Sequence, residues 1–203
     1  MKKLLFLVFA LATLMQVSAK GGFGTEWGLT AGIRYNGMSL KGAPDGLSVT
    51  PHMTYNVGIH ASLAFAGIAV QPEINYGYTT LNATYQGFDA KIKAHDVEVP
   101  VLLSLRFLPI VRFNVGPVFN IMSKANYVNG NETLMYGGLR PSVGYAAGIS
   151  LCFLKKLIID ARFVGYFKPA ANEFNPYSPV VGDNAINFDT RGYSGGIKVG
   201  FLF

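Results

Sequence analysis

Tyr193-Ser-Gly-Gly-Ile-Lys-Val-Gly-Phe-Leu-Phe203 alternates apolar residues with small or polar ones. One face carries Tyr193, Ile197, Val199, Phe201 and Phe203, and apart from Leu202 the other face is small or polar. This period of two is typical of a β-strand whose two faces meet different surroundings. Soluble proteins rarely leave such an apolar strand at an open edge, because it invites aggregation. A membrane β-barrel needs the pattern, since one face meets lipid and the other the lumen.

Seven earlier segments repeat this alternation over about ten residues each, the length that a tilted strand needs to cross a bilayer. They are residues 27–36, 54–65, 68–78, 96–107, 111–122, 142–152 and 157–167. Short turns near residues 66, 109 and 154 alternate with long polar connections at 37–53, 79–95, 123–141 and 168–192. Outer-membrane barrels alternate short periplasmic turns with long outer loops, whereas a soluble sandwich has no reason to do so. The sequence therefore predicts an all-β fold, an eight-stranded antiparallel up-and-down transmembrane β-barrel.

The first residues predict export through the Sec pathway. Lys2 and Lys3 precede an apolar run over residues 4–15, and Val17-Ser-Ala19 supplies the small residues before a cleavage site. The run is shorter than the roughly 20 residues that a membrane-spanning helix requires. We expect a cleaved signal peptide at 1–19, a barrel domain at 20–203, and a location in the cell outer membrane of a Gram-negative bacterium.

Composition excludes several other classes. The single Cys152 cannot form an internal disulfide, which argues against a small disulfide-stapled secreted domain. The pI near 9.4 comes from basic residues scattered singly along the chain, without a nucleic-acid-binding motif. We therefore expect no nucleic-acid partner, and the modest positive charge suits anionic lipid.

Alternation directs a set of ionisable side chains into the predicted lumen. They are Arg34, His60, Glu73, Glu98, Arg106, Arg112, Asp160, Arg162 and Lys198. The interior of an eight-stranded barrel is narrow enough for side chains to fill it. These groups are accordingly predicted to pair with one another as a structural polar network. The alternative is a small-solute path or a proton-sensitive gate, in which the excess of bases over acids would favour anions.

His60 and Ser62 share one strand face, with acids at Glu73 and Glu98. This arrangement is similar to the His, Ser and acid of outer-membrane lipid A deacylases. The flanking apolar residues place the pair inward, away from lipid substrates, so we expect no enzyme and no catalytic residues. A lipid A-modifying hydrolase is kept as a minor alternative. The histidines at 52, 60 and 95 lack metal-ligand spacing, and neither a metal nor another cofactor is expected.

Aromatic residues concentrate near the ends of the predicted strands, where a barrel would place its two interfacial girdles. They are Trp27, Tyr35, Tyr55, Phe65, Tyr76, Tyr78, Phe107, Phe119, Phe153, Phe163, Phe167, Tyr193, Phe201 and Phe203.

Two motifs carry a family resemblance. Val70-Gln-Pro-Glu-Ile-Asn-Tyr76 followed by Val97-Glu-Val-Pro-Val-Leu-Leu103 resembles the PorT-like outer-membrane β-barrel family of Bacteroidetes. The strands at 112–117, 144–148 and 160–162 are similar to later strands of that family, and the likeness covers residues 22–203. It implies the barrel fold and an outer-membrane location. One branch of the family is associated with protein secretion.

The expected role is structural, recognition, or accessory to the envelope or to secretion. Expected partners are outer-membrane lipid, the barrel-assembly machinery during insertion, and an envelope protein that contacts the outer loops. The assembly machinery would read the terminal signal Tyr193, Gly196, Val199, Phe201 and Phe203. The alternative is a barrel that binds or transports a small solute or an amphipathic ligand, and a third class is a soluble periplasmic barrel of lipocalin type.

Overall fold

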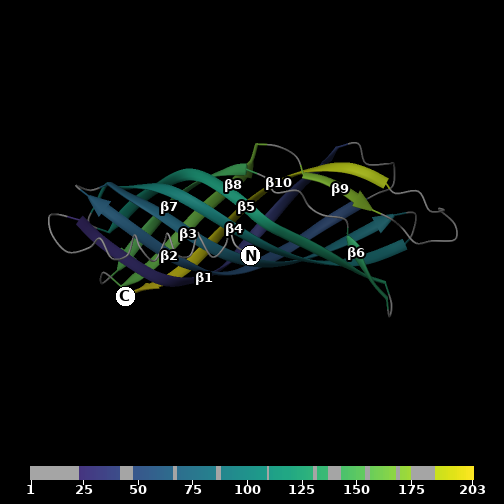
Figure 1. Ribbon diagram of the computed structural model, residues 1–203, viewed down its shortest axis with the longest axis horizontal. Helices are drawn as coiled ribbons and strands as arrows, with labels where there is room; N and C mark the ends of the chain where they lie inside the picture. The colour runs from purple at the N-terminus through teal and green to yellow at the C-terminus, as the bar shows by residue number, and fades with distance from the viewer. Residues whose placement is uncertain are drawn as a thin grey trace.

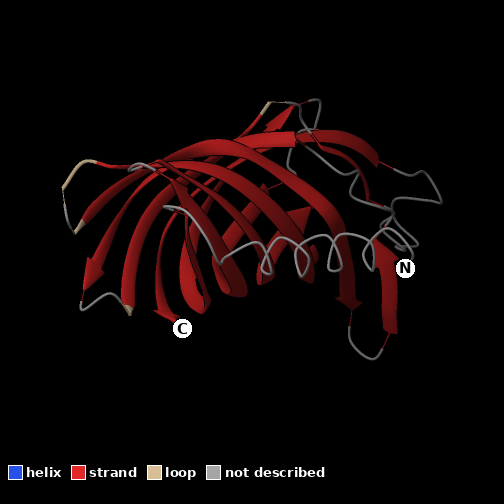
Figure 2. Cartoon of the chain, turned by 60° about the vertical axis from the view of Figure 1, so that its left-hand side comes forward, coloured by secondary structure: helices blue, strands red, loops and turns tan. Residues whose placement is uncertain are grey.

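A computed structural model describes residues 23–41, 48–65, 68–85, 88–108, 110–129, 132–136, 143–153, 156–167, 170–174 and 186–203. Figure 2 shows these residues almost entirely as strands. The strands are β1 (Phe23–Lys41), β2 (Ser48–Phe65), β3 (Ile68–Tyr85), β4 (Phe88–Arg106), β5 (Val111–Asn129), β6 (Glu132–Tyr136), β7 (Val143–Phe153), β8 (Leu157–Tyr166), β9 (Ala170–Phe174) and β10 (Ile186–Leu202). Residues 1–22 lie outside the described part, so the signal peptide at 1–19 stays a prediction.

Eight of these strands form a closed antiparallel barrel in the order β1-β2-β3-β4-β5-β7-β8-β10. β10 closes the barrel by pairing with β1, from Gly28↔Leu202 to Lys41↔Asp189. The short β6 and β9 pair with the outer ends of β5 and β10, at the right-hand end of Figure 1. The predicted eight-stranded up-and-down barrel is confirmed. Among the described residues, no helix is long and apolar enough to cross a membrane.

The period of two separates an outward apolar face from an inward face along each strand. On β10, Val199 and Phe201 are 48% and 47% exposed, whereas Lys198 is 6% exposed. Leu202 breaks the polar pattern of the inward face, and the structure explains why. Its side chain packs inside the barrel against Cys152 and Ile158, where the three form a small apolar cluster at the end that carries the short turns.

The strands are longer than the apolar alternation predicts. The connections expected at 37–53 and 79–95 are largely strand, because β1 continues to Lys41, β2 begins at Ser48, and only residues 86 and 87 separate β3 from β4. A strand of 19 residues is roughly 60 Å long, whereas a tilted strand needs roughly 35 Å to cross an apolar band about 25 Å tall. The barrel therefore projects beyond the membrane on the side opposite the short turns.

The reason for this difference is visible on β3. Its outward residues change from Ile74, Tyr76 and Tyr78 to Thr80, Asn82 and Thr84, while pairing with β4 continues without interruption to Tyr85↔Phe88. Outward side chains need to be apolar only where they meet lipid, so the apolar pattern stops at the membrane edge although the strand does not. We call the projecting part, residues 37–53, 79–95, 123–136 and 170–192 where described, the outer collar.

Among the described residues, the barrel strands are shortest at β7 and β8, which have 11 and 10 residues. The pairing of β5 with β7 ends at Phe119↔Val143, and β5 pairs with β6 again from Ala125↔Tyr136. On the other side, β8 pairs with β10 as far as Gly165↔Tyr193. The described residues show no pairing between β6 and β9.

Aromatic rings contact one another at both ends of the lipid-facing band. Near the short turns, the Trp27 and Phe203 ring centroids are 4.6 Å apart. Near the outer collar, the Tyr145 and Phe167 centroids are 5.2 Å apart, and those of Tyr78 and His95 are 5.1 Å apart. We call this second group, with Tyr76, the outer aromatic belt. Rings at these two levels suit the two membrane interfaces.

Gly116 permits a close approach between β5 and β4. A Cβ at this inward position would lie 2.2 Å from the Val101 carbonyl oxygen, which is backbone and cannot rotate away. Gly116→Ala is expected to destabilise the barrel by about 1–3 kcal/mol through overpacking. Gly195→Ala is the matched control, because a Cβ there meets nothing within 4 Å. Urea unfolding in lipid vesicles, followed by tryptophan fluorescence, would measure both variants. Equal unfolding midpoints would contradict the close approach.

Candidate functional site

The interior of the barrel is lined by buried polar and charged side chains. On β3, Glu73 is 2% exposed and Asn75 is 5% exposed, and on β2 His60 is 4% exposed. Strand alternation aims these side chains at the axis because their neighbours in sequence face lipid. A buried charge is tolerated when it is paired and hydrogen-bonded. The pairing inside this barrel is organised in three layers along its axis.

The middle layer centres on the Glu73 carboxylate. Arg162 donates two hydrogen bonds to it, from Nη1 to Oε2 at 2.7 Å and from Nη2 to Oε1 at 2.9 Å. Lys198 Nζ also donates to Oε2 at 2.7 Å, and Asn75 Nδ2 donates to the same oxygen at 3.1 Å. His60 Nδ1 lies 3.5 Å from Oε1. A bidentate arginine pair with further donors is among the strongest arrangements that a carboxylate can have.

Asp160 extends this layer toward β5 and β7. The Arg162 guanidinium that holds Glu73 also contacts Asp160, with 3.0 Å between Nε and Oδ1. Ser150 Oγ donates to Asp160 Oδ2 at 2.6 Å, and Asn114 Nδ2 donates to the same oxygen at 3.1 Å. One arginine therefore joins two carboxylates, and the resulting network reaches most of the strands of the barrel.

A second layer lies nearer the outer collar and centres on Glu98. Arg34 Nη1 donates to Glu98 Oε2 at 2.5 Å, and Arg34 Nη2 donates to Asp96 Oδ2 at 3.3 Å. The hydroxyl of Tyr166 donates to Glu98 Oε1 at 2.5 Å. Beyond these groups, Thr54 hydrogen-bonds the hydroxyl of Thr79.

A third layer, near the short turns, is a single ion pair. Arg112 Nη1 and Nη2 donate to the two carboxylate oxygens of Glu26 at 2.9 and 3.2 Å. The Glu26 side chain is 30% exposed and that of Arg112 is 7% exposed, so this pair lies where the lumen meets water.

Two of these ion pairs span the whole barrel. In the strand order, β3 and β8 lie on opposite sides, as do β1 and β5. The Glu73–Arg162 pair therefore crosses the lumen in one direction, and the Glu26–Arg112 pair crosses it in another. The Arg34–Glu98 pair joins β1 to β4. These contacts connect distant strands of the barrel wall, and they also occupy the centre of the lumen.

Little space remains among the side chains of this network. A cavity of about 20 Å³ lies between Arg34, Glu98, Arg162 and Lys198, with Asn56 and Asn75 also lining it. A volume of this size holds about one water molecule. Beside it, Leu102, Val118, Ala146 and Val164 pack as an apolar cluster on the inner face, with Tyr166 against them. At this level, the space left among the described side chains that line this cavity is about the size of one water molecule.

The structure brings together most of the predicted lumen residues. Arg34, His60, Glu73, Glu98, Arg112, Asp160, Arg162 and Lys198 all take part in the contacts above. Arg106 does not join them, because it is the last residue of β4 and its side chain is exposed to water beside the short turn.

Sequence reasoning missed two carboxylates of the network and the tyrosine that hydrogen-bonds Glu98. Glu26 precedes the first predicted segment by one residue. Asp96 is the first residue of the fourth segment and lies on the same strand face as Glu98. Tyr166 also lies on the inward face of its strand, but it carries no charge that would identify it as a member of the network. Extending the alternation by one or two residues beyond the apolar run would have found Glu26 and Asp96.

This revised membership changes the expected charge of the lumen. Among the described side chains, the network contains four cations, Arg34, Arg112, Arg162 and Lys198. They face five carboxylates, Glu26, Glu73, Asp96, Glu98 and Asp160. Among the described side chains of the network, carboxylates therefore outnumber cations, so the network lacks the excess of positive charge that would favour anions.

His60 and Ser62 do not form a nucleophile–base pair in the described structure. His60 Nδ1 faces Glu73, whereas Ser62 Oγ is buried without a hydrogen-bond partner, and so is His60 Nε2. Both side chains point into the closed lumen, away from the lipid-facing surface. Within the described ranges, no three His, Cys, Asp or Glu side chains gather in a way that could hold a metal ion.

Comparison with known proteins agrees with this architecture. Residues 16–165 match the family described as "Outer membrane protein beta-barrel domain". The chain belongs to this family. Its fold and location are thus those of an outer-membrane β-barrel protein. No curated protein sequence matches the chain.

Two solved outer-membrane proteins have a similar shape. OprG from Pseudomonas aeruginosa is similar with a TM-score of 0.59 and 15% identity, covering 91% of this chain and 97% of OprG. AlkL, determined in DMPC bilayers, has a TM-score of 0.52 and 7% identity, covering 92% and 93%. Ail of Yersinia pestis has a TM-score of 0.48 and 16% identity, covering 88% and 98%. At identities this low, OprG and AlkL show a shared fold alone.

Proposed function

We propose that this outer-membrane β-barrel protein is a closed barrel with a structural, recognition, or envelope- and secretion-accessory role. The observation that carries the proposal is the network of ion pairs that crosses and fills the lumen. A channel needs a continuous wet path, whereas the cavity inside the network, about 20 Å³, holds about one water molecule. A transporter of polar solutes would have to break several buried ion pairs in each cycle, and each such break is costly.

The outer collar supplies the surface on which such a role would act. Strands that continue beyond the lipid hold their side chains rigidly, because the backbone ladder fixes their spacing. On β2, Ser48 and Thr50 are exposed near the tip of the collar. A rigid polar edge supported by a braced barrel suits contact with another envelope component better than a mobile loop does, because less conformational freedom is lost on binding.

Photocrosslinking in intact cells would test this role. A crosslinking amino acid at position 48 or 50 is expected to capture a defined protein partner. The same group at position 29 should capture lipid, because Leu29 lies on the lipid-facing surface and is 54% exposed. If positions 48 and 50 yield only lipid or no adduct in cells that contain folded barrel, the recognition role is wrong.

We also propose membership in the PorT-like group, export through the Sec pathway and recognition by the barrel-assembly machinery. The Gln-Pro-Glu and Glu-x-Pro strands support membership in the PorT-like group of Bacteroidetes, and with it a link to secretion. The apolar N-terminal run supports export through the Sec pathway. The terminal residues Tyr193, Gly196, Val199, Phe201 and Phe203 support recognition by the barrel-assembly machinery.

A second candidate function is the binding of an amphipathic ligand beside β7 and β8, where the described barrel strands are shortest. There the outer ends of β7 and β8 lie beside the apolar cluster of Leu102, Val118, Ala146 and Val164. The Glu98–Tyr166 hydrogen bond lies next to that cluster, so apolar and polar surfaces are adjacent. A fluorescent fatty acid should then bind nanodisc-embedded barrel saturably, and Val118→Asp should weaken this binding. Partitioning equal to that of empty nanodiscs would remove this candidate.

A further inference from the structure

The outer half of β4 presents an exposed row of basic residues. Lys91 and Lys93 are exposed, whereas Ile92 and Ala94 between and beside them are 3% and 9% exposed. The alternation therefore turns Ile92 and Ala94 toward the lumen and the two lysines away from it. His95 continues the same outward row toward the membrane, and its side chain is partly exposed.

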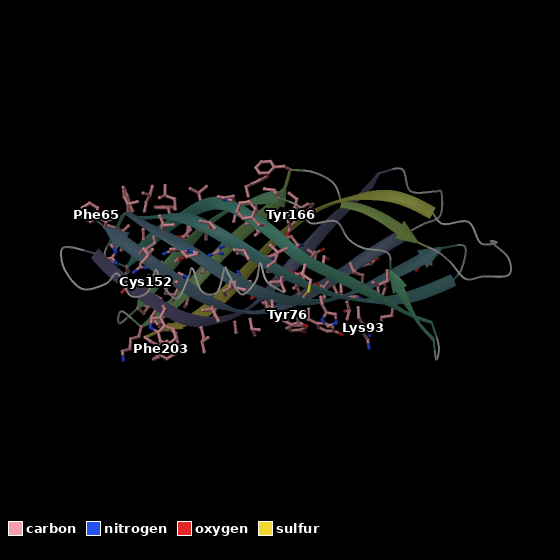
Figure 3. The ribbon with its side chains drawn as sticks, in the orientation of Figure 1. Phe65, Tyr76, Lys93, Cys152, Tyr166 and Phe203 are labelled. Carbon is pink, nitrogen blue, oxygen red and sulfur yellow. The ribbon has the colours of Figure 1, made fainter. Side chains whose placement is uncertain are left out.

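This row begins at the outer aromatic belt. The Tyr76 hydroxyl and His95 Nδ1 are 2.5 Å apart, and the Tyr78 ring lies 5.1 Å from that of His95. Figure 3 shows Tyr76 and Lys93 along the same side of the barrel. Aromatic rings of this kind mark the level of the lipid headgroups. Two strand residues span roughly 7 Å, so Lys93 lies just beyond that level and Lys91 one step further.

Among the described side chains, the two lysines have no carboxylate partner, unlike the cations inside the barrel. Arg34, Arg112, Arg162 and Lys198 all pair with described carboxylates. Lys91 and Lys93 have no such partner among the described side chains. Their cross-strand neighbours on β3, Asn82 and Thr80, are uncharged hydrogen-bonding residues. On β5, Lys124 occupies the register position opposite His95.

We propose that this face of β3 and β4, comprising Tyr76, Tyr78, His95, Lys93 and Lys91, binds the phosphate groups of a lipid headgroup in the outer leaflet. Charge complementarity and continuity with the lipid-facing surface point to this occupant. Lysine acts as a point charge toward phosphate. A basic residue close to an anionic membrane surface is moderately attracted to the headgroups. Two lysines that act together would favour headgroups that carry more negative charge. The tyrosine rings would lie against the acyl chains below.

Native mass spectrometry of the detergent-solubilised full chain would test this site, with diphosphorylated lipid A as the probe. Lys91→Gln combined with Lys93→Gln is expected to weaken binding by about ten- to thirtyfold. Lys91→Arg combined with Lys93→Arg should retain it. Binding of the same glycolipid without its phosphates should be weaker and unaffected by the substitutions. A gel shift on heating would establish that each variant is folded.

Lys156→Gln provides the matched control, because it removes one positive charge at the opposite end of the barrel. Lys156 Nζ lies 5.9 Å from the centroid of the Phe201 ring, far from the outer aromatic belt. This variant should bind diphosphorylated lipid A as the unsubstituted protein does. The proposal is overturned if the Lys91 and Lys93 double glutamine variant binds normally. It is also overturned if Lys156→Gln weakens binding as much, or if removal of the phosphates makes no difference.

Discussion

Glu73→Ala is expected to destabilise the barrel by about 3–5 kcal/mol, the usual cost of breaking a buried ion pair from one side. The substitution would leave Arg162 and Lys198 without their shared acceptor. Both side chains are almost fully buried, at 7% and 8% exposed, so water cannot replace the lost carboxylate cheaply. Urea unfolding of the barrel in lipid vesicles would measure the change in the free energy of unfolding.

Two further variants separate the charge effect from the loss of side-chain volume. Glu73→Gln keeps the shape and one acceptor oxygen, so its cost should come mainly from the missing charge. Combining Glu73→Gln with Lys198→Met removes one cation together with the anion, and this double variant should recover part of the lost stability. Asn75→Ala, which removes one hydrogen bond at 3.1 Å, should cost about 1 kcal/mol. An unchanged unfolding midpoint for Glu73→Ala would show that the network does not hold the wall together.

Deletion of residues 201–203 is expected to reduce the folded barrel in the outer membrane severely. Phe203 N donates to the Trp27 carbonyl oxygen at 2.8 Å, and Leu202 N donates to the Lys156 carbonyl oxygen at 2.7 Å. The Trp27 and Phe203 rings also contact each other. The deletion removes these bonds and three apolar side chains, each of which contributes about 1.5–3 kcal/mol when removed from water. β10 would then pair with β1 over a shorter length, and this pairing is the one that closes the barrel.

Quantitative blotting of outer-membrane fractions, with and without heating, would measure the deletion. Phe203→Tyr is the matched control, because it keeps the ring beside Trp27 and leaves the backbone bonds intact, and it should assemble normally. Outer-membrane levels of the truncated chain equal to those of the full chain would contradict the closing role of this segment.

The number and order of the barrel strands were predictable because contact with lipid requires an apolar residue at every second position of a strand. Wherever a strand faces hydrocarbon its outward residues must be apolar, and Val199 and Phe201 show this as clearly as Leu29 and Val57 on neighbouring strands. The same rule explains where prediction stopped. Thr80 and Asn82 are strand residues that face water, so no apolar period marks them, and their segment was interpreted as a long connection.

The sequence predicts which side chains face the lumen, but not which of them pair with one another. The alternation predicts that Glu73, Arg162 and Lys198 face the lumen, and their side chains are buried there. Register sets only the neighbours on adjacent strands, such as His60 opposite Glu73. A contact across the lumen, such as Glu73 with Arg162, depends on the closure of the barrel, which alternation does not reveal. Arg106 shows the converse error, because its parity is inward but the strand ends there and the side chain reaches water.

Planar-bilayer recording of the purified full-length barrel would show whether ion pairs close the lumen. We expect no stepwise ion current in symmetric salt from a bilayer that contains inserted, heat-modifiable barrel. Glu73→Ala should be compared in the same bilayers, because it removes the carboxylate that joins β3 to Arg162 and Lys198. Reproducible, discrete current steps from the unsubstituted protein would mean that the ion pairs do not close the lumen.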